Sequence, residues 1–330
     1  MGFTAVLLTF AVIFVNGLTD APNAVATCVS SRAIKLKYAL FISASFNFLG
    51  VFTSYFMNNA VTDTIVNMVN FGADNQKASV ALGGALFSIV LWAIIAWFFG
   101  IPTSESHALI AGLTGSALAI NGSFSGINPE EWVKSIYGLL TSCGGGFIAG
   151  YLVCRTVVFA FRNTKRFKAT AFFNKAQIFS AICMSFMHGA QDGQKFIALL
   201  HLCLKYSGIQ SSDADFFIIL LCSAVMGMGT LFGGKRIIKS IGIDMMKTEK
   251  YQGFSADFAA SVSLLFSTIW GFPVSTTHAK TTAMIGTAFA KSKKALNKGI
   301  IKNLFSTWVF TFPGCGIIGF FITKIFLKIF

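Results

Sequence analysis

The sequence predicts an all-α membrane protein with an inverted-topology repeat, two broken helices and two re-entrant helical hairpins. Three observations lead to this fold class. Of the 330 residues, 55% are hydrophobic and 12% are charged, and the mean hydropathy is +0.70, which is too apolar for a soluble domain. Apolar runs close to the roughly 20 residues of a membrane span follow one another along the chain. Two polar motifs recur in the same order in the two halves.

Each apolar run is expected to be helical, because runs of this length lack the alternating pattern of barrel strands. Two of them contain polar interruptions, which predict the broken helices. The predicted segments cover about 3–31 (interrupted near 17–24), 38–57, 79–99, 105–121, 135–161, 176–204 (interrupted near 188–195), 214–232, 256–271, 277–290 and 303–327.

The first repeated motif combines a proline with hydroxyl side chains between two apolar runs. Gly100–His107 reads Gly-Ile-Pro-Thr-Ser-Glu-Ser-His, and Gly271–His278 reads Gly-Phe-Pro-Val-Ser-Thr-Thr-His, an offset of 171 (273 − 102). Non-helical backbone at membrane depth must be buried in protein or line a polar cavity. A break of this kind that occurs twice therefore indicates a transport site.

The second repeated motif opens each half. Gly17–Asn23 reads Gly-Leu-Thr-Asp-Ala-Pro-Asn, and Gly189–Lys195 reads Gly-Ala-Gln-Asp-Gly-Gln-Lys, an offset of 172 (192 − 20). Two motif pairs at nearly one offset indicate duplication. The predicted halves are 1–170, with three spans and the hairpin 79–121, and 171–330, with three spans and the hairpin 256–290. Because each half has an odd number of full spans, the second half has the opposite orientation in the membrane to the first.

The basic residues support this topology. With both termini outside, the predicted inner loops contain 18 of the 26 Lys and Arg residues, as the positive-inside rule requires. Because the basic residues gather at segment ends, the net charge of +14 favours a membrane over nucleic acid. The 18 are Arg32, Lys35, Lys37, Arg162, Lys165, Arg166, Lys168, Lys175, Lys235, Arg236, Lys239, Lys247, Lys250, Lys291, Lys293, Lys294, Lys298 and Lys302.

Hairpins that enter from opposite sides would bring the two Pro-Ser motifs together near the bilayer midplane. Each motif begins a helix, whose first amides have no intrahelical partner and whose dipole favours negative charge. Two such N-termini with their hydroxyls predict a cage for a small oxyanion, although the hydroxyls could instead only cap the helices. The hydroxyl residues are Thr103, Ser104, Ser106, Ser275, Thr276 and Thr277.

Acidic residues inside the apolar runs predict cation coupling. Burying the carboxylates of Asp20 and Asp192 at membrane depth costs free energy, so we expect them to be paired or functional. With Asn23 they could coordinate Na⁺. Lys195 stands where Asn23 stands in the first half, and it could pair with Asp192, as a purely structural pair, or with the anion. Glu105 is a candidate proton carrier, because burial beside an anion favours its protonated form; a first-turn Glu that only stabilises its helix is the alternative.

Other chemistries are disfavoured by the motifs. His107, His188 and His278 lack the spacing of a metal site and are expected to be packed, hydrogen-bonded side chains. Gly-x-Ser-x-Gly is absent, and the P-loop-like run 229–235 is followed by Arg236 in place of Ser or Thr. The chain is therefore expected to be no enzyme and to need no cofactor.

These paired motifs closely resemble those of the inorganic phosphate transporter (PiT) family over nearly the whole chain. The resemblance implies a homodimeric symporter in the cell membrane that moves phosphate with Na⁺ or H⁺; a sulfate transporter of the same fold and an anion channel are the alternatives. Thr19-Asp20 and Gln191-Asp192 stand where the family usually has Asn-Asp, and Glu105 replaces a hydroxyl. The implied substrate site comprises Ser104, Ser106, Ser275, Thr276, Thr277, Gln191, Gln194 and Lys195, and the implied cation site comprises Asp20, Asn23 and Asp192.

Overall fold

The computed structural model of the chain describes residues 2–99, 103–208, 214–234, 238–239, 242, 245, 248–292 and 296–330. These residues form α-helices joined by short loops, with a short 3₁₀ segment after the first helix. Five helices are long and apolar enough to cross a bilayer within the part of the chain described: Phe3–Ser30, Leu36–Met57, Asn75–Phe99, Pro129–Ala160 and Lys298–Ile329.

The elements follow the order of the predicted segments, with one addition. The first half contains α1 (Gly2–Thr19), η1 (Ala21–Val25), α2 (Ala26–Ser30), α3 (Leu36–Met57), α4 (Ala60–Met68), α5 (Asn75–Phe99), α6 (Glu105–Asn121), the 3₁₀ turn η2 (Phe124–Gly126) and α7 (Pro129–Ala160). The second half contains α8 (Arg166–Ser207), α9 (Ala214–Phe232), α11 (Lys250–Ile269), α12 (Thr276–Lys291) and α13 (Lys298–Ile329). The nine-residue α4 was not predicted, because it is too short to stand out as an apolar run.

The first helix is interrupted where a proline makes interruption necessary. α1 ends at Thr19, and the chain continues as the 3₁₀ segment η1, with Pro22 in its first turn. Proline has no backbone N–H, so a regular helix cannot form all of its hydrogen bonds there. The break leaves Asp20 and Asn23 in the buried interior.

The predicted break in the second half is wrong. α8 is a single helix of 42 residues that runs without interruption through Gly189–Lys195. That stretch contains no proline, and its glycines serve close packing against α3. A Cβ atom on Gly189 would collide with the backbone of Asn47, and one on Gly193 would crowd Val51.

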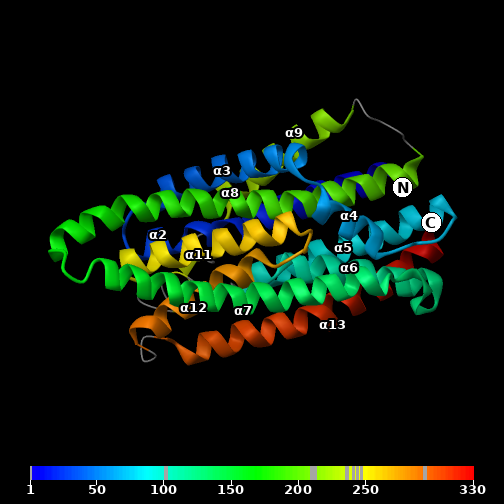
Figure 1. Cartoon of the computed structure of the whole chain (residues 1–330). Coiled ribbons are helices and arrows are strands. Elements are labelled where there is room, and N and C mark those ends of the chain that lie inside the picture. The colour runs from blue at the N-terminus through cyan, green and yellow to red at the C-terminus, as the bar shows by residue number, and fades with distance from the viewer. Residues whose placement is uncertain are drawn as a thin grey trace.

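The helices lie side by side along one long direction (Figure 1), in which α7 and α8 extend over most of the molecule. The pair α11 and α12 lies toward the end where α7 is joined to α8, and the pair α5 and α6 lies toward the opposite end. Both termini lie at that opposite end. The N-terminal ends of α6 and α12 meet in the interior, where a direct hydrogen bond joins Ser104 to Ser275.

Each helix pair has its own apolar core. One cluster of buried residues surrounds α5 and α6 and includes Leu82 and Leu109. The other surrounds α11 and α12 and includes Leu264 and Met284. The apolar side chains are buried in these two clusters, and polar residues gather between them, at the N-terminal tips of α6 and α12.

Candidate functional site

Two serines at the helix tips form the centre of the site. Ser104 is the N-cap of α6 and accepts a hydrogen bond from His107 N at 3.3 Å. Ser275 is the N-cap of α12 and accepts one from His278 N at 3.2 Å. The Ser104 hydroxyl also donates to the Ser275 hydroxyl at 2.8 Å. Two helix N-termini, each the positive end of its dipole, therefore converge on one point.

A buried lysine from α8 reaches both tips. Lys195 Nζ donates to Asp192 Oδ1 at 2.7 Å, to Ser106 Oγ at 2.6 Å and to the Val274 carbonyl at 2.7 Å. Only 2% of Lys195 is exposed, and a buried charge needs both a counter-charge and hydrogen bonds. Its ammonium group therefore joins α8, the α6 tip and the α12 tip.

Asp20, at the break after α1, also contacts both tips. Its carboxylate accepts hydrogen bonds from Thr277 Oγ1 at 2.9 Å and from Glu105 N at 3.4 Å. Thr19 Oγ1 donates to Glu105 Oε1 at 3.2 Å. The break in the first helix thus supplies acceptors to the amide of α6 and to a hydroxyl of α12.

Asp192 lies beside Asp20 and is surrounded by donors. Asn16 Nδ2 donates to Asp192 Oδ2 at 3.1 Å, Thr276 Oγ1 donates to it at 3.5 Å, and His188 Nε2 lies 3.4 Å from the same oxygen. One oxygen of each of the two carboxylates and a ring nitrogen of His188 lie within 4.8 Å of one another.

Sequence reasoning missed the roles of Asn16 and His188 beside these carboxylates. His188 was expected to be a packed histidine, and its Nδ1 does lie 2.7 Å from Asn47 Oδ1, but its other nitrogen faces Asp192. A signal for both was present, because Asn16 and His188 each precede the glycine of the motif that opens their half. Extending the motif by one residue would have included them.

Several buried polar atoms of the site have no hydrogen-bond partner among the described residues. They include Asn23 Oδ1, Thr103 Oγ1 and Glu105 Oε2. Unpaired buried acceptors carry a desolvation cost that a bound cation or proton can remove. A hard cation such as Na⁺ prefers oxygen ligands, and the carboxylate of Asp20 with the amide oxygen of Asn23 fits that preference.

Two predicted substrate residues contact the protein backbone. Gln191 Nε2 donates to the Phe272 carbonyl at 2.8 Å, and Gln191 Oε1 accepts from Thr268 Oγ1 at 2.5 Å. Gln194 Oε1 accepts from Val61 N at 3.1 Å, so this side chain holds α4. None of these three contacts involves Ser104 or Ser275. The predicted residues Gly100, Ile101 and Pro102, and among the basic residues Lys235, Arg236, Lys247, Lys293 and Lys294, lie outside the described residues.

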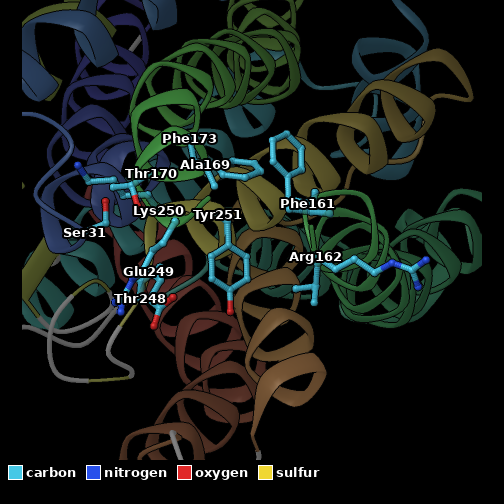
Figure 2. A pocket seen from close by; sticks show the side chains of 13 residues that line it. Ser31, Phe161, Arg162, Ala169, Thr170, Phe173, Thr248, Glu249, Lys250 and Tyr251 are labelled. Atoms are coloured by element: carbon cyan, nitrogen blue, oxygen red, sulfur yellow. The ribbon is translucent and has the colours of Figure 1, made fainter. Parts of the chain in front are cut away.

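A surface cavity of about 550 Å³ lies away from this site, between the α7–α8 connection and the start of α11. Arg162, Arg166 and Lys250 are among its lining residues. Figure 2 shows the Arg162 side chain pointing away from the other labelled side chains. Lys250 Nζ donates to Asn174 Oδ1 at 2.5 Å. Arg162 and Lys250, two of the cationic residues that line this cavity, therefore do not point into it together. We assign the function to the interior site.

The helical fold with a buried, charged site between helix breaks defines a multi-pass membrane transporter. The chain belongs to the phosphate transporter family, whose sequence profile matches residues 16–319. The predicted family is confirmed, and since the family is one of transporters, the chain is not an enzyme.

Individual relatives cover nearly the whole chain. A probable low-affinity inorganic phosphate transporter of Rhizobium meliloti is 36% identical, over 96% of this chain and 93% of the relative. A protein of the same description from Bacillus subtilis is 32% identical, over 93% and 92%. The solved structure of the sodium-dependent phosphate transporter matches with a TM-score of 0.86 over 99% of both chains, and at 22% sequence identity it shows a shared fold.

Proposed function

We propose that this protein is a symporter that imports inorganic phosphate together with Na⁺ or H⁺. The observation that carries the proposal is the meeting of two helix N-termini at the Ser104–Ser275 hydrogen bond. The relatives described as inorganic phosphate transporters support the choice of anion. The similarity to the sodium-dependent transporter supports Na⁺ as the coupling ion.

The anion is held by the helix tips in this proposal. Amides in the first turns of α6 and α12, which have no intrahelical partner, donate to its oxygens, and the dipoles of both helices favour its negative charge. Hydroxyl groups of the tip residues supply further donors, and the positive charge of Lys195, whose three N–H groups are held by Asp192, Ser106 and Val274, attracts the anion. All of these groups are buried, so water competes weakly with the anion for them.

A hydrogen-bond acceptor in the site favours phosphate over sulfate. Phosphate carries a proton at neutral pH and can donate a hydrogen bond, whereas sulfate cannot. Glu105 Oε2 is buried and has no donor among the described residues. An ionised Glu105 would accept the proton of a bound phosphate, and the same carboxylate can carry a coupled proton.

Cations balance the carboxylates in this proposal. Asp20, Asp192 and Glu105 lie in one buried region, and among the described residues only Lys195 forms a lysine or arginine ion pair with any of them. An incoming anion increases the excess of negative charge. Na⁺ at Asp20 and Asn23, or a proton, therefore has to accompany the anion.

The packing of the helices supports two related halves, 1–170 and 171–330. α6 packs against α13, and its counterpart α12 packs against α7. α5 packs against α1, and its counterpart α11 packs against α8. We propose that the two hairpins are re-entrant and that their motion against the other helices alternates access to the site. We also propose that both termini lie on the outer side of the membrane and that the protein forms a homodimer.

The test is uptake of labelled phosphate into proteoliposomes, with Na⁺ and pH gradients imposed separately. We expect accumulation against the phosphate gradient under at least one of the two, with weak competition by sulfate. Downhill flux alone would indicate a channel. If phosphate neither enters nor competes for entry, the substrate assignment is wrong.

A further inference from the structure

The motifs that open the two halves differ at one position that carries charge, and in the hairpin motifs Glu105 corresponds to the uncharged Thr276. Asp20 corresponds to Asp192, and three residues later Asn23 corresponds to Lys195. Each half therefore has a carboxylate, but only the second half has its own ammonium group. Symmetry of the repeat would place equivalent ligands around both carboxylates.

The Lys195 ammonium group occupies a set of ligands typical of a bound cation. Its three acceptors are a carboxylate of Asp192, a hydroxyl of Ser106 and the carbonyl of Val274, at 2.6–2.7 Å. Carboxylates, hydroxyls and carbonyls are the oxygen ligands that hard cations take. Pairing with Asp192 alone would not require contact with both hairpin tips.

The corresponding place beside Asp20 has oxygen ligands without a resident charge. Thr277, the counterpart of Ser106, donates its hydroxyl hydrogen to Asp20 at 2.9 Å. Asn23 is 2% exposed, and its amide oxygen has no donor in the described part of the chain. Lysine and arginine ion pairs to Asp20 are absent among those residues.

We infer that the ammonium group of Lys195 is a built-in cation that replaces a transported one at Asp192, so that a free cation is needed at Asp20 only. This inference rests on the proposed function, which it deepens by setting the charge balance of the cycle. A tethered cation stays with the protein when the anion leaves. The protein therefore moves one positive charge fewer per anion than it would with asparagine at position 195.

The test compares the wild type with Lys195→Asn, which gives the second half the residue of the first. In proteoliposomes with equal Na⁺ concentration and pH on both sides, the membrane potential at which net phosphate flux stops yields the charge moved per phosphate, whichever cation is coupled. We expect this charge to increase by one in the variant. An unchanged charge per phosphate would overturn the inference. Lys205→Asn, an exposed lysine on the same helix, should leave the value unchanged.

Equilibrium binding of ²²Na⁺ to the purified proteins counts cation sites without transport, and we expect one more site in a folded Lys195→Asn variant than in the wild type. Where the wild type binds Na⁺, an equal number of sites in the variant would also overturn the inference. If Lys195→Asn fails to fold, Asn23→Lys provides the reciprocal test, and it should lower the charge per phosphate by one. A wild type that does not carry phosphate refutes the proposed function instead, whereas a wild type that carries it with unchanged variants refutes only this inference.

Discussion

Ser275 combines two roles in a single hydroxyl group. Its oxygen accepts from His278 N and from the Ser104 hydroxyl, at 3.2 and 2.8 Å. The first contact caps α12, and the second joins the two hairpin tips. Both contacts orient the helix tip where the proposed anion binds. Replacing Ser275 by alanine therefore tests the proposed anion site by removing a single oxygen atom.

Ser275→Ala should lower the apparent affinity for phosphate. A hydrogen bond to a charged group is worth about 1.5–3 kcal/mol, which corresponds to about ten- to hundred-fold in affinity. The lost cap should lower stability by about 1 kcal/mol. Uptake at varied phosphate concentration and thermal unfolding measure the two effects. Ser123→Ala, which removes the cap of an exposed 3₁₀ turn, should leave uptake unchanged; equal uptake by the two variants would argue against a tip site.

Asp192→Asn should abolish coupled uptake, because it removes the carboxylate of the buried Lys195 pair. Breaking a buried pair by removing one partner costs about 3–5 kcal/mol. The matched control is Asp74→Asn, since Asp74 and Lys77 have the same spacing but are exposed and 3.6 Å apart. Uptake driven by an imposed Na⁺ or pH gradient is the measurement. Accumulation by Asp192→Asn at the wild-type level would remove this carboxylate from the coupling mechanism.

At the scale of the elements, a second buried ion pair fastens one hairpin to the first helix break. Lys280 on α12 pairs with Asp257 on α11, and its ammonium group also donates to the Ala24 carbonyl at 3.3 Å and to Thr27 Oγ1 at 3.2 Å. The corresponding residues in the other hairpin are Leu86 and Leu109, both buried. The α11–α12 hairpin is therefore held by an ion pair at the position where the α5–α6 hairpin has two packed leucines.

Lys280→Leu alone should destabilise the protein by about 3–5 kcal/mol, because it leaves Asp257 buried without its counter-charge. The double variant Asp257→Leu/Lys280→Leu should lose less, since replacing a whole buried pair by apolar residues is often neutral. Thermal unfolding of both singles and the double gives the coupling energy. Additive losses would show that the pair contributes no mutual stabilisation.

At the scale of the whole molecule, the loops divide between two ends. The α7–α8 connection lies at one end, and both termini lie at the other (Figure 1). Arg162, Lys165 and Arg166 are all at the α7–α8 connection. By the positive-inside rule we expect that end to face the cytoplasm, as in the proposed topology.

Cysteine labelling on intact cells tests this orientation. Asn163 lies in the α7–α8 connection and Ala73 in the loop before α5, and both are exposed. A membrane-impermeant thiol reagent should label Ala73→Cys directly, and Asn163→Cys only after permeabilisation. The native cysteines are buried or half-buried, so the unmodified protein provides the background. The reverse pattern would invert the proposed topology.

The sequence predicted features that depend on local chemistry. Long apolar runs predict membrane helices, and Pro22 interrupts the first of them because proline cannot donate its hydrogen bond. Ser104 and Ser275 are caps because their hydroxyls suit the first turn of a helix. The fold class as an all-α membrane protein and the family follow from these features and their repetition.

Other features depend on which segments pack together, so the tertiary structure decided them. α8 stays continuous through Gly189–Lys195, where the chain has no proline and where glycines that could also have marked a break pack closely against α3. Asn16 and His188 face Asp192 only because two distant helices adjoin there. The sequence left Lys195 two possible partners, Asp192 and the anion, and its contacts with Asp192, Ser106 and Val274 exist because the fold brings α8 and both hairpin tips within one side-chain length.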